Sequence, residues 1–304
     1  MLPANILASL LSLPRVGRIT VRKICFAVRN PPAGIKELHK EISRLKLLPS
    51  VSLNVFLKAV DSTNSEFDKL ANSNISVYTT SDDSFPALLK DIPNPPIILY
   101  CKGNINGLLD NPTVTVIGTR KPSDWGYNTA VNLSETLSNE KFTVVSGLAV
   151  GSDSAAHIGC LKGKGKTAAV LGLGLGMVYP KSNLELADEI IDKGGCLISE
   201  YAYNTKPHKG YYIERDQLQS GLSFGTIVVE TNLKGGAMQT VNAALKQKRR
   251  LYCLSQPASV LTTKSVGNQF LIKRKLAIPI GNAVSIRSMM IDIKSDFNAS
   301  DRMK

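Results

Sequence analysis

Cysteine is scarce in this chain and poorly placed for cross-linking. The five cysteines form no close pair and have no spacing of the kind that metal sites use; they are Cys25, Cys101, Cys160, Cys196 and Cys253. Scattered free cysteines behave as small buried apolar side chains in a reducing compartment. The pattern excludes a disulfide-stapled fold and a zinc site, and we expect neither a metal nor a cofactor.

Long hydrophobic runs and a basic leader are also missing. No apolar segment approaches the roughly 20 residues that a membrane span requires. The first residues, MLPANILASLLSLPRVG, are apolar but reach Pro14 and Arg15 early, which disfavours a signal peptide. We therefore expect a cytoplasmic protein with no membrane segment.

Acidic residues are fewer than basic ones. The chain has 24 Asp and Glu against 37 Lys and Arg, which gives a formal net charge of +13. Such an excess serves solubility or the binding of a polyanion such as nucleic acid, and charge alone does not decide between them. The 304 residues are 43% hydrophobic and 20% charged, which suits a folded protein with one large and one smaller domain.

Between residues 113 and 255, short apolar runs alternate with segments of helical spacing. The predicted strands are 113–118, 142–146, 167–172, 196–200, 225–230 and 249–254, and the predicted helices are 127–138, 153–162, 182–193, 214–221 and 238–247. Nearly continuous apolar strands are typical of a parallel sheet that is covered on both faces. The pattern predicts an α/β fold with a doubly wound, mostly parallel sheet.

Three regions are predicted along the chain. Residues 1–75 form a small helical N-terminal domain of the helix-hairpin-helix or SAM-like kind, because the turn LPRVG at 13–17 resembles half of a helix-hairpin-helix. Arg15 stands there in place of a glycine, and a plain helical packing unit is the alternative. Residues 76–288 form the sheet domain, which opens with a proline-rich connector carrying an edge strand. Residues 289–304 form a polar tail that we expect to fray.

The ends of the predicted strands carry small and polar residues. Ligands of parallel α/β sheets bind outside these carboxyl ends, where glycine turns expose backbone N–H groups to anions. Cations accompany them: Lys181 begins one helix, Lys209 lies in the loop after the fourth strand, and Arg215 opens the next helix. These residues predict a phosphate-binding rim, whose strand-end members are Gly118, Thr119, Arg120, Ser146, Gly147, Gly235 and Gly236.

Two other motifs carry less weight. The glycine run at 172–176 has the wrong spacing for a dinucleotide fingerprint and follows the third strand instead of the first, and Glu200 is the nearest acidic residue for a ribose. Asp153 and Ser154 are interpreted as a helix cap, and His157 as a packed or hydrogen-bonded helix residue. No catalytic residue is predicted.

Several of these motifs occur together in the order of a known family. The chain resembles the DprA/Smf (DNA-processing protein A) family over about residues 76 to 280. The matching segments are FPALLKDIPNPPIILYCKG, VIGTR, VVSGLAVGSDSAAH, LGLGLGMVYPKSN, Ser199-Glu200, SGLS at 220–223, KGGAMQT at 234–240, and Ser265, Gly267 and Asn268.

The resemblance implies a non-enzymatic protein with an extended Rossmann-like core. Family members bind single-stranded DNA without sequence preference in natural transformation (competence) and DNA recombination. They act as dimers, protect the DNA and load the RecA recombinase onto it. The family's basic pocket corresponds here to Arg120, Lys181, Lys209 and Arg215.

This chain departs from the family in three places. It reads Arg215-Asp216-Gln217 where the family usually has Arg-Asn-Arg, it carries Thr231 after Glu230 where the family has alanine, and we expect it to lack the C-terminal winged helix of many members. These differences suggest a divergent member that acts in transformation, conjugation or defence. The alternative is a sensor or hydrolase of small nucleotides that uses the same rim, although the Pro-Gly-Gly-x-Gly-Thr loop of phosphoribohydrolases is missing here.

Overall fold

The computed structural model describes residues 2–48 and 51–301. Its centre is a nine-stranded sheet with the order β1-β2-β6-β5-β4-β3-β7-β8-β9. All pairs from β6 to β9 in that order are parallel, whereas β2 pairs antiparallel with both β1 and β6. The strands are β1 Ile75–Thr79, β2 Ile98–Gly103, β3 Thr113–Ile117, β4 Thr143–Ser146, β5 Thr167–Leu171, β6 Cys196–Ser199, β7 Gly225–Val228, β8 Arg250–Leu254 and β9 Ile278–Ile280.

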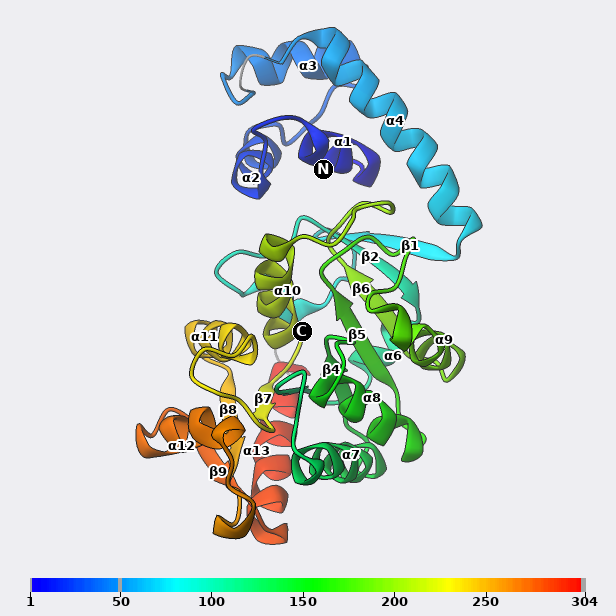
Figure 1. Cartoon of the computed structure of the whole chain (residues 1–304). Coiled ribbons are helices and arrows are strands. Elements are labelled where there is room, and N and C mark those ends of the chain that lie inside the picture. Colours follow the sequence, from blue (N-terminus) through cyan, green and yellow to red (C-terminus); the bar gives the residue numbers. More distant parts are fainter. Residues whose placement is uncertain (1, 49–50, 302–304) are drawn as a thin grey trace.

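The α/β class with a doubly wound, mostly parallel sheet is confirmed (Figure 1). The six predicted strands correspond to β3 through β8, and the connector after residue 75 supplies β1 and β2. Strand β9 was not predicted, because its sequence is only Ile-Pro-Ile. The helices are α1 Ala4–Ser12, α2 Arg18–Ala27, α3 Ile35–Arg44, α4 Leu53–Asn72, α5 Ala87–Lys90, α6 Asn106–Leu109, α7 Asp124–Asn139, α8 Ser152–Lys162, α9 Leu184–Asp192, α10 Lys209–Gly221, α11 Ala237–Lys246, α12 Val266–Lys273 and α13 Ala283–Asp301.

Helices cover both faces of the sheet. Successive strand residues alternate between clusters, since Val144 packs with α7 and α8 whereas Val145 packs with α10. Strand β5 shows the same alternation, with Ala169 on the α9 side and Val170 on the α10 side. Side chains of successive strand residues point to opposite faces, so apolar runs are required where both faces are buried. None of the helices described is both long and apolar enough to cross a membrane.

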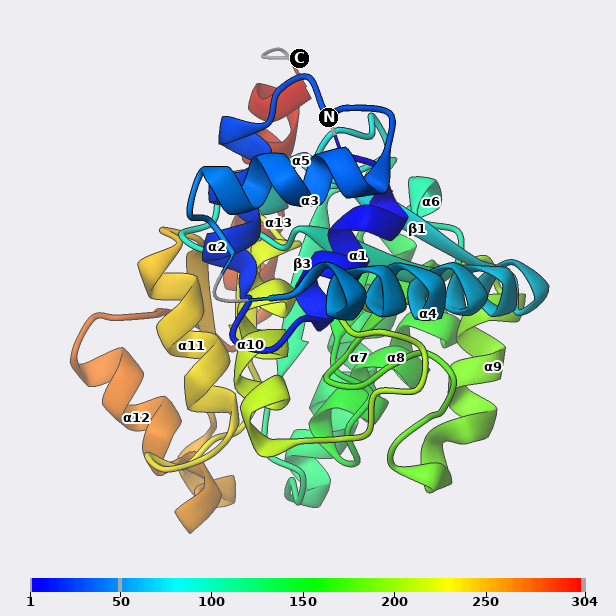
Figure 2. The same cartoon turned by 90° about the horizontal axis from the view of Figure 1, so that it is seen from above.

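Helices α1 to α4 form the predicted helical unit, which lies over β1 and β2 at one end of the sheet (Figures 1 and 2). One apolar cluster joins it to the sheet, because Leu10 and Phe56 belong to the same cluster as Tyr100 and Leu171. In the turn between α1 and α2, Arg15 adopts a φ of 64°, which is the left-handed conformation that glycine favours. The turn therefore keeps its shape without the glycine.

The prediction of a frayed polar tail from residue 289 is wrong as far as residue 301. Helix α13 continues to Asp301 and buries Met289, Met290 and Ile293 against the cluster that contains α7 and α8. Arg250 at the start of β8 also forms ion pairs with Asp292 and Asp296 of this helix. Residues 302–304 lie outside the described part of the chain.

Candidate nucleic-acid interface

A cavity of about 410 Å³ opens at the carboxyl end of the sheet, between α10 and the N-terminus of α11. Parallel strands place their carboxyl ends at one edge, so segments far apart in sequence meet there. The lining residues come from the end of β3 and the turn after it, from the β4–α8 loop and α8, from α10, and from the β7–α11 loop and α11. They are Ile117, Gly118, Thr119, Arg120, Ala149, Asp153, Tyr212, Arg215, Asp216, Gln219, Thr231, Asn232, Gly235, Gly236, Ala237 and Thr240.

The turn after β3 is held by its neighbours on both sides. The N–H of Thr119 donates to the carbonyl of Glu230 at 2.8 Å, and the carbonyl of Thr119 accepts from the N–H of Ser152 at 3.1 Å. A Cβ at Gly118 would lie 2.3 Å from Oγ of Ser152, so only glycine fits this crossing. The expectation of free N–H groups is therefore wrong for Thr119, and the turn serves to project Arg120.

The N-terminus of α11 supplies backbone donors instead. Within the described chain, the N–H groups of Gly236 and Ala237 donate to no acceptor, and the first turn carries no acidic residue. Gly235 and Gly236 precede the helix, as predicted, and both line the cavity. Unpaired N–H groups at a helix N-terminus attract anions, because they carry the positive end of the helix dipole.

Tyr212 lies between two guanidinium groups. The centre of its ring is 5.7 Å from Cζ of Arg120 and 6.0 Å from Cζ of Arg215. The Tyr212 hydroxyl is buried and has no hydrogen-bond partner in the described chain. Arg120 is exposed and makes no ion pair with any described carboxylate, so its charge is available to a ligand.

Arg215 is an internal cation at the floor of the cavity. Its side chain is only 7% exposed; Nε lies 3.2 Å from Oδ1 of Asp216, and Nη1 lies 4.0 Å from Oδ2 of Asp153. The same Nη1 donates to the carbonyl of Val170 at 3.2 Å. Burial raises the pKa of Asp216 to about 6, with repulsion from Asp153 adding to it and Arg215 opposing it. The Asp216 carboxylate therefore offsets the charge of Arg215 at neutral pH, while burial also raises the pKa of Asp153.

Ser146 and Gly147 serve the protein interior and do not line the cavity. Oγ of Ser146 donates to the carbonyl of Val116 at 2.7 Å inside the sheet. A Cβ at Gly147 would lie 1.4 Å from Nη1 of Arg215, so this glycine makes room for the Arg215–Asp153 contact. The interpretation of Asp153 as a helix cap is wrong, because Gly151 caps α8 and Asp153 faces Arg215.

Lys181 and Lys209 are exposed and lie outside the cavity lining. Lys181 begins a short 3-10 turn after Tyr179, and Tyr179 lies close enough to Tyr212 to contribute to that residue's raised pKa, which burial mainly causes. Lys209 is the first residue of α10, not a loop residue, so Arg215 lies in mid-helix instead of opening it. Lys209 therefore belongs to a helix that lines the cavity, whereas Lys181 precedes α9, which does not line it.

Glu230 and His157 have side chains of the types that enzymes use in catalysis, but both make hydrogen bonds within the protein. Glu230 is buried and accepts from the N–H and Oγ of Ser123, the N-cap of α7, at 2.7 and 2.6 Å. His157 is buried, and its Nδ1 lies 2.7 Å from Oγ1 of Thr167, which confirms its interpretation as a hydrogen-bonded helix residue. Burial lowers the pKa of His157 to about 3, with Arg215 contributing, so this imidazole stays neutral at physiological pH.

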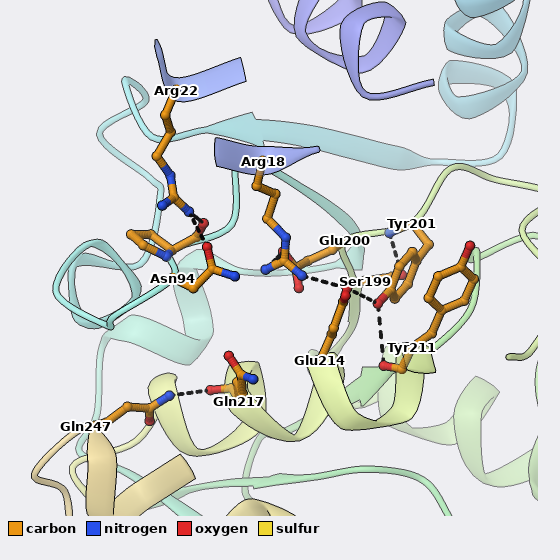
Figure 3. Close-up of polar contacts among 11 residues, drawn as sticks. Arg18, Arg22, Asn94, Ser199, Glu200, Tyr201, Tyr211, Glu214, Gln217 and Gln247 are labelled. Carbon is orange, nitrogen blue, oxygen red and sulfur yellow. Dashed lines mark hydrogen bonds and ion pairs between the residues drawn. The ribbon is translucent and has the colours of Figure 1, made fainter. Parts of the chain in front are cut away.

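Glu200 and the glycine run face the N-terminal domain and the loop after β6. Oε1 of Glu200 pairs with Nη1 of Arg18 at 3.0 Å (Figure 3). The N–H groups of Gly174 and Gly176 donate to the carbonyls of Thr205 and Tyr203. Because of these contacts, neither Glu200 nor the glycine run is arranged to bind a dinucleotide.

Sequence reasoning missed Asp153, Gln219 and Thr240 as lining residues. Gln219 and Thr240 are ordinary interior positions of their helices, and nothing local distinguishes them. Asp153 faces its arginine only because α8 and α10, which cover opposite faces of the sheet, both reach its carboxyl edge.

Known proteins resemble this chain along most of its length. A family model described as DNA recombination-mediator protein A matches residues 76–290. The Smf protein of Synechocystis is 37% identical over 190 residues, which cover 62% of this chain and 48% of that protein. The DNA processing protein DprA of Bacillus subtilis is 35% identical and the match covers 60% of it. The chain therefore spans only about half of these two relatives. The DprA of Streptococcus pneumoniae is 34% identical over 74% of this chain and 77% of its own.

Two solved structures share the fold. The structure of DprA from Streptococcus pneumoniae superposes with a TM-score of 0.77 and 28% identity, covering 95% of this chain and 98% of that one. A DNA processing protein A from Helicobacter pylori, described with a single-stranded DNA binding mode, superposes with a TM-score of 0.63 and 28% identity, covering 74% of this chain and 98% of that one.

Proposed function

This chain belongs to the DNA recombination-mediator protein A family, and from that premise we propose that it binds single-stranded DNA without sequence preference. The observation that carries the proposal is the cavity at the carboxyl end of the sheet, where an unpaired arginine, an aromatic ring and free backbone donors meet. Binding of this kind combines phosphate neutralisation with stacking of bases on aromatic rings.

Each group has a distinct task in the proposed complex. The N–H groups of Gly236 and Ala237 bind a phosphate, and the guanidinium of Arg120 neutralises it. The Tyr212 ring offers a surface for a base, with Arg120 beside it. Lys181 and Lys209 extend the cationic track beyond the cavity. Arg215 acts indirectly, because its pairs with Asp153 and Asp216 fix the floor.

The family also implies a homodimer and the loading of RecA recombinase onto the bound strand, and we propose both for this chain. The main alternative is a sensor or hydrolase of small nucleotides at the same rim. Glu230 is engaged with the N-cap of α7, so it is not placed as a catalytic glutamate of that class. Mass spectrometry of nucleotides released from the purified protein separates the two, since a sensor would carry a stoichiometric nucleotide.

Fluorescence anisotropy with single- and double-stranded oligonucleotides tests the proposal. Each phosphate contact contributes about −0.7 to the slope of log affinity against log salt for single strands, so three exposed cations predict a slope near −2. Reversing the charge of Arg120 and Lys181 together should abolish the binding.

The matched control is the double reversal of Lys162 and Lys193, two exposed lysines at the C-terminal ends of α8 and α9, which changes the net charge equally. If the Arg120 and Lys181 variant binds as tightly as this control, the cavity is not the DNA site. Circular dichroism verifies that both variants are folded.

A further inference from the structure

A second cavity, of about 520 Å³, lies between the N-terminal helical domain and the sheet domain. Helices α1, α2 and α4 form one side, and β2, the loop after β6 and α10 form the other. The lining residues are Ala8, Leu11, Ser12, Val16, Gly17, Arg18, Thr63, Glu66, Ile97, Ile98, Tyr100, Glu200, Tyr201, Ala202, Thr205, Tyr211 and Glu214. A volume of this size is typical of small-molecule sites, which lie preferentially between domains.

The charges of this cavity do not balance. Arg18 is its only lining cation, and its guanidinium is shared between Oε1 of Glu200 at 3.0 Å and Oε2 of Glu214 at 2.6 Å (Figure 3). Glu66 is a third lining carboxylate, whose Oε1 accepts from the N–H of Tyr203. Three carboxylates therefore face one arginine, in a chain whose net charge is +13.

One carboxylate oxygen of Glu200 lacks a hydrogen-bond partner in the described chain. Its side chain is only 7% exposed, and its second oxygen, Oε2, is buried without any hydrogen bond in the described chain. A buried carboxylate oxygen without a donor costs free energy, so a cationic donor placed there is bound strongly. The hydroxyl of Tyr201 does not supply this donor, because it points to Glu214 at 2.8 Å.

The remaining lining selects an organic cation over a metal ion. Leu11, Val16 and Ile97 present an apolar wall, and the rings of Tyr201 and Tyr211 lie against each other, tilted by 32° with their centres 4.2 Å apart. Hard metal ions require several oxygen ligands, and the described residues include no group of three acidic, histidine or cysteine side chains arranged to hold one. An alkyl chain fits the apolar wall, and an ammonium group fits the carboxylates.

We propose that this interdomain cavity binds an aliphatic diamine or polyamine, with an ammonium group donating to Oε2 of Glu200 and the alkyl chain packed against Leu11 and Ile97. Glu214 and Glu66 supply the additional negative charge that favours a dication over a simple amine. The bound cation contacts α1, the segment after β6 and α10, so it bridges the domain boundary. The proposal is independent of DNA binding, since none of these residues lines the cavity at the sheet edge.

Isothermal titration calorimetry of the full chain without DNA, at pH 8, tests the proposal. The probe is 1,4-diaminobutane, and the uncharged comparator is 1,4-butanediol. We expect saturable one-to-one binding of the diamine and no heat from the diol. Glu200→Gln should lower the affinity for the diamine by about tenfold or more, because it removes a charge-assisted hydrogen bond.

Two further variants keep the result decisive. Glu214→Gln changes a side chain that is 47% exposed, so we expect the fold to tolerate it. It should lower the affinity for the diamine several-fold. Glu140→Gln removes a surface carboxylate that pairs with Lys294, and it should leave the affinity unchanged. The proposal is overturned if the wild-type chain shows no saturable binding of the diamine, or if Glu140→Gln lowers the affinity for the diamine as much as Glu214→Gln does.

Discussion

Asp216 is the side chain whose replacement should strengthen DNA binding. It lines the cavity at the sheet edge and lies 3.2 Å from Nε of Arg215, so its carboxylate cancels positive charge where a phosphate is proposed to bind. Asp216→Asn keeps the shape of the side chain and adds one unit of positive charge to the site. Arg215 retains Asp153 and the carbonyl of Val170 as partners, so the floor of the cavity persists.

The magnitude follows from Coulomb's law. For a phosphate roughly 7 Å from the carboxylate, an effective dielectric constant of about 20 gives a repulsion of about 2 kcal/mol before salt screening. Screening by salt at physiological strength reduces this to about 1 kcal/mol, so we expect an affinity gain between about fivefold and thirtyfold at pH 7.5.

The pH dependence provides the sharper check. Because burial raises the pKa of Asp216 to about 6, its carboxylate is mostly ionised at pH 7.5 and mostly neutral at pH 5. The wild-type chain should therefore gain affinity as the pH falls through 6, and the difference from Asp216→Asn should disappear by pH 5. Anisotropy titrations of a labelled oligonucleotide at four pH values measure the DNA affinity of the wild-type chain and that of Asp216→Asn. Asp192→Asn, at the exposed end of α9, is the matched control. The electrostatic reasoning is refuted if the ratio of the Asp216→Asn affinity to the wild-type affinity stays constant with pH, or if Asp216→Asn binds DNA more weakly than the wild-type chain.

Three further predictions concern stability. Burial raises the pKa of Glu200 from 4.5 to about 7, so the group's stabilising contribution is complete below pH 4.5 and lost as the pH rises through 7. Replacing it with glutamine should flatten the pH dependence of the unfolding free energy by of the order of 3 kcal/mol across that range, as measured by urea denaturation. Gly147→Ala should displace the guanidinium of Arg215 and cost about 3–5 kcal/mol by separating a buried ion pair, whereas Gly17→Ser, at the exposed N-cap of α2 where φ is negative and a Cβ meets no atom within 4 Å, serves as the comparison. Deleting residues 287–304 removes the three buried apolar side chains of α13 and uncovers the apolar surface that they cover, which should cost about 4–9 kcal/mol, read as a lower midpoint of thermal unfolding; an unchanged midpoint contradicts the packing described.

The parallel part of the sheet was predictable because its physical signal is local. Strands buried on both faces must be apolar at every position, and β3 to β8 each end within two residues of their predicted limits. The signal fails where burial is partial. Strand β9 has two exposed residues, one of them a proline, and α13 carries the adjacent buried Met289 and Met290 among exposed and half-buried residues. Neither pattern differs locally from that of a loop or a tail.

The candidate site was predictable in position but not in its ion pairs. The rule that ligands bind at the carboxyl ends of strands places Gly118, Arg120 and Gly236 together, and the structure does so. The rule does not say what a glycine makes room for. Gly147 makes room for the side chain of Arg215, yet in sequence it resembles a glycine that makes room for a phosphate. The pairing of Arg215 with Asp153 depends on how α8 and α10 cross the sheet, and no periodicity in the sequence reports that.

Helix α10 forms the wall between the two cavities, and this has a thermodynamic consequence. Tyr212 and Arg215 face the cavity at the sheet edge, whereas Tyr211 and Glu214 face the cavity beneath α2. A helix is stiff along its length, so a displacement of α10 toward Arg18 also moves Tyr212 relative to Arg120. If a bound diamine changes the position of α10, it changes the affinity for DNA by some factor, and linkage requires DNA to change the diamine affinity by the same factor. The factor is measured by titrating each ligand with and without the other. The Glu200→Gln variant then identifies its origin, because it abolishes coupling through α10 and leaves a direct interaction between diamine and DNA unchanged.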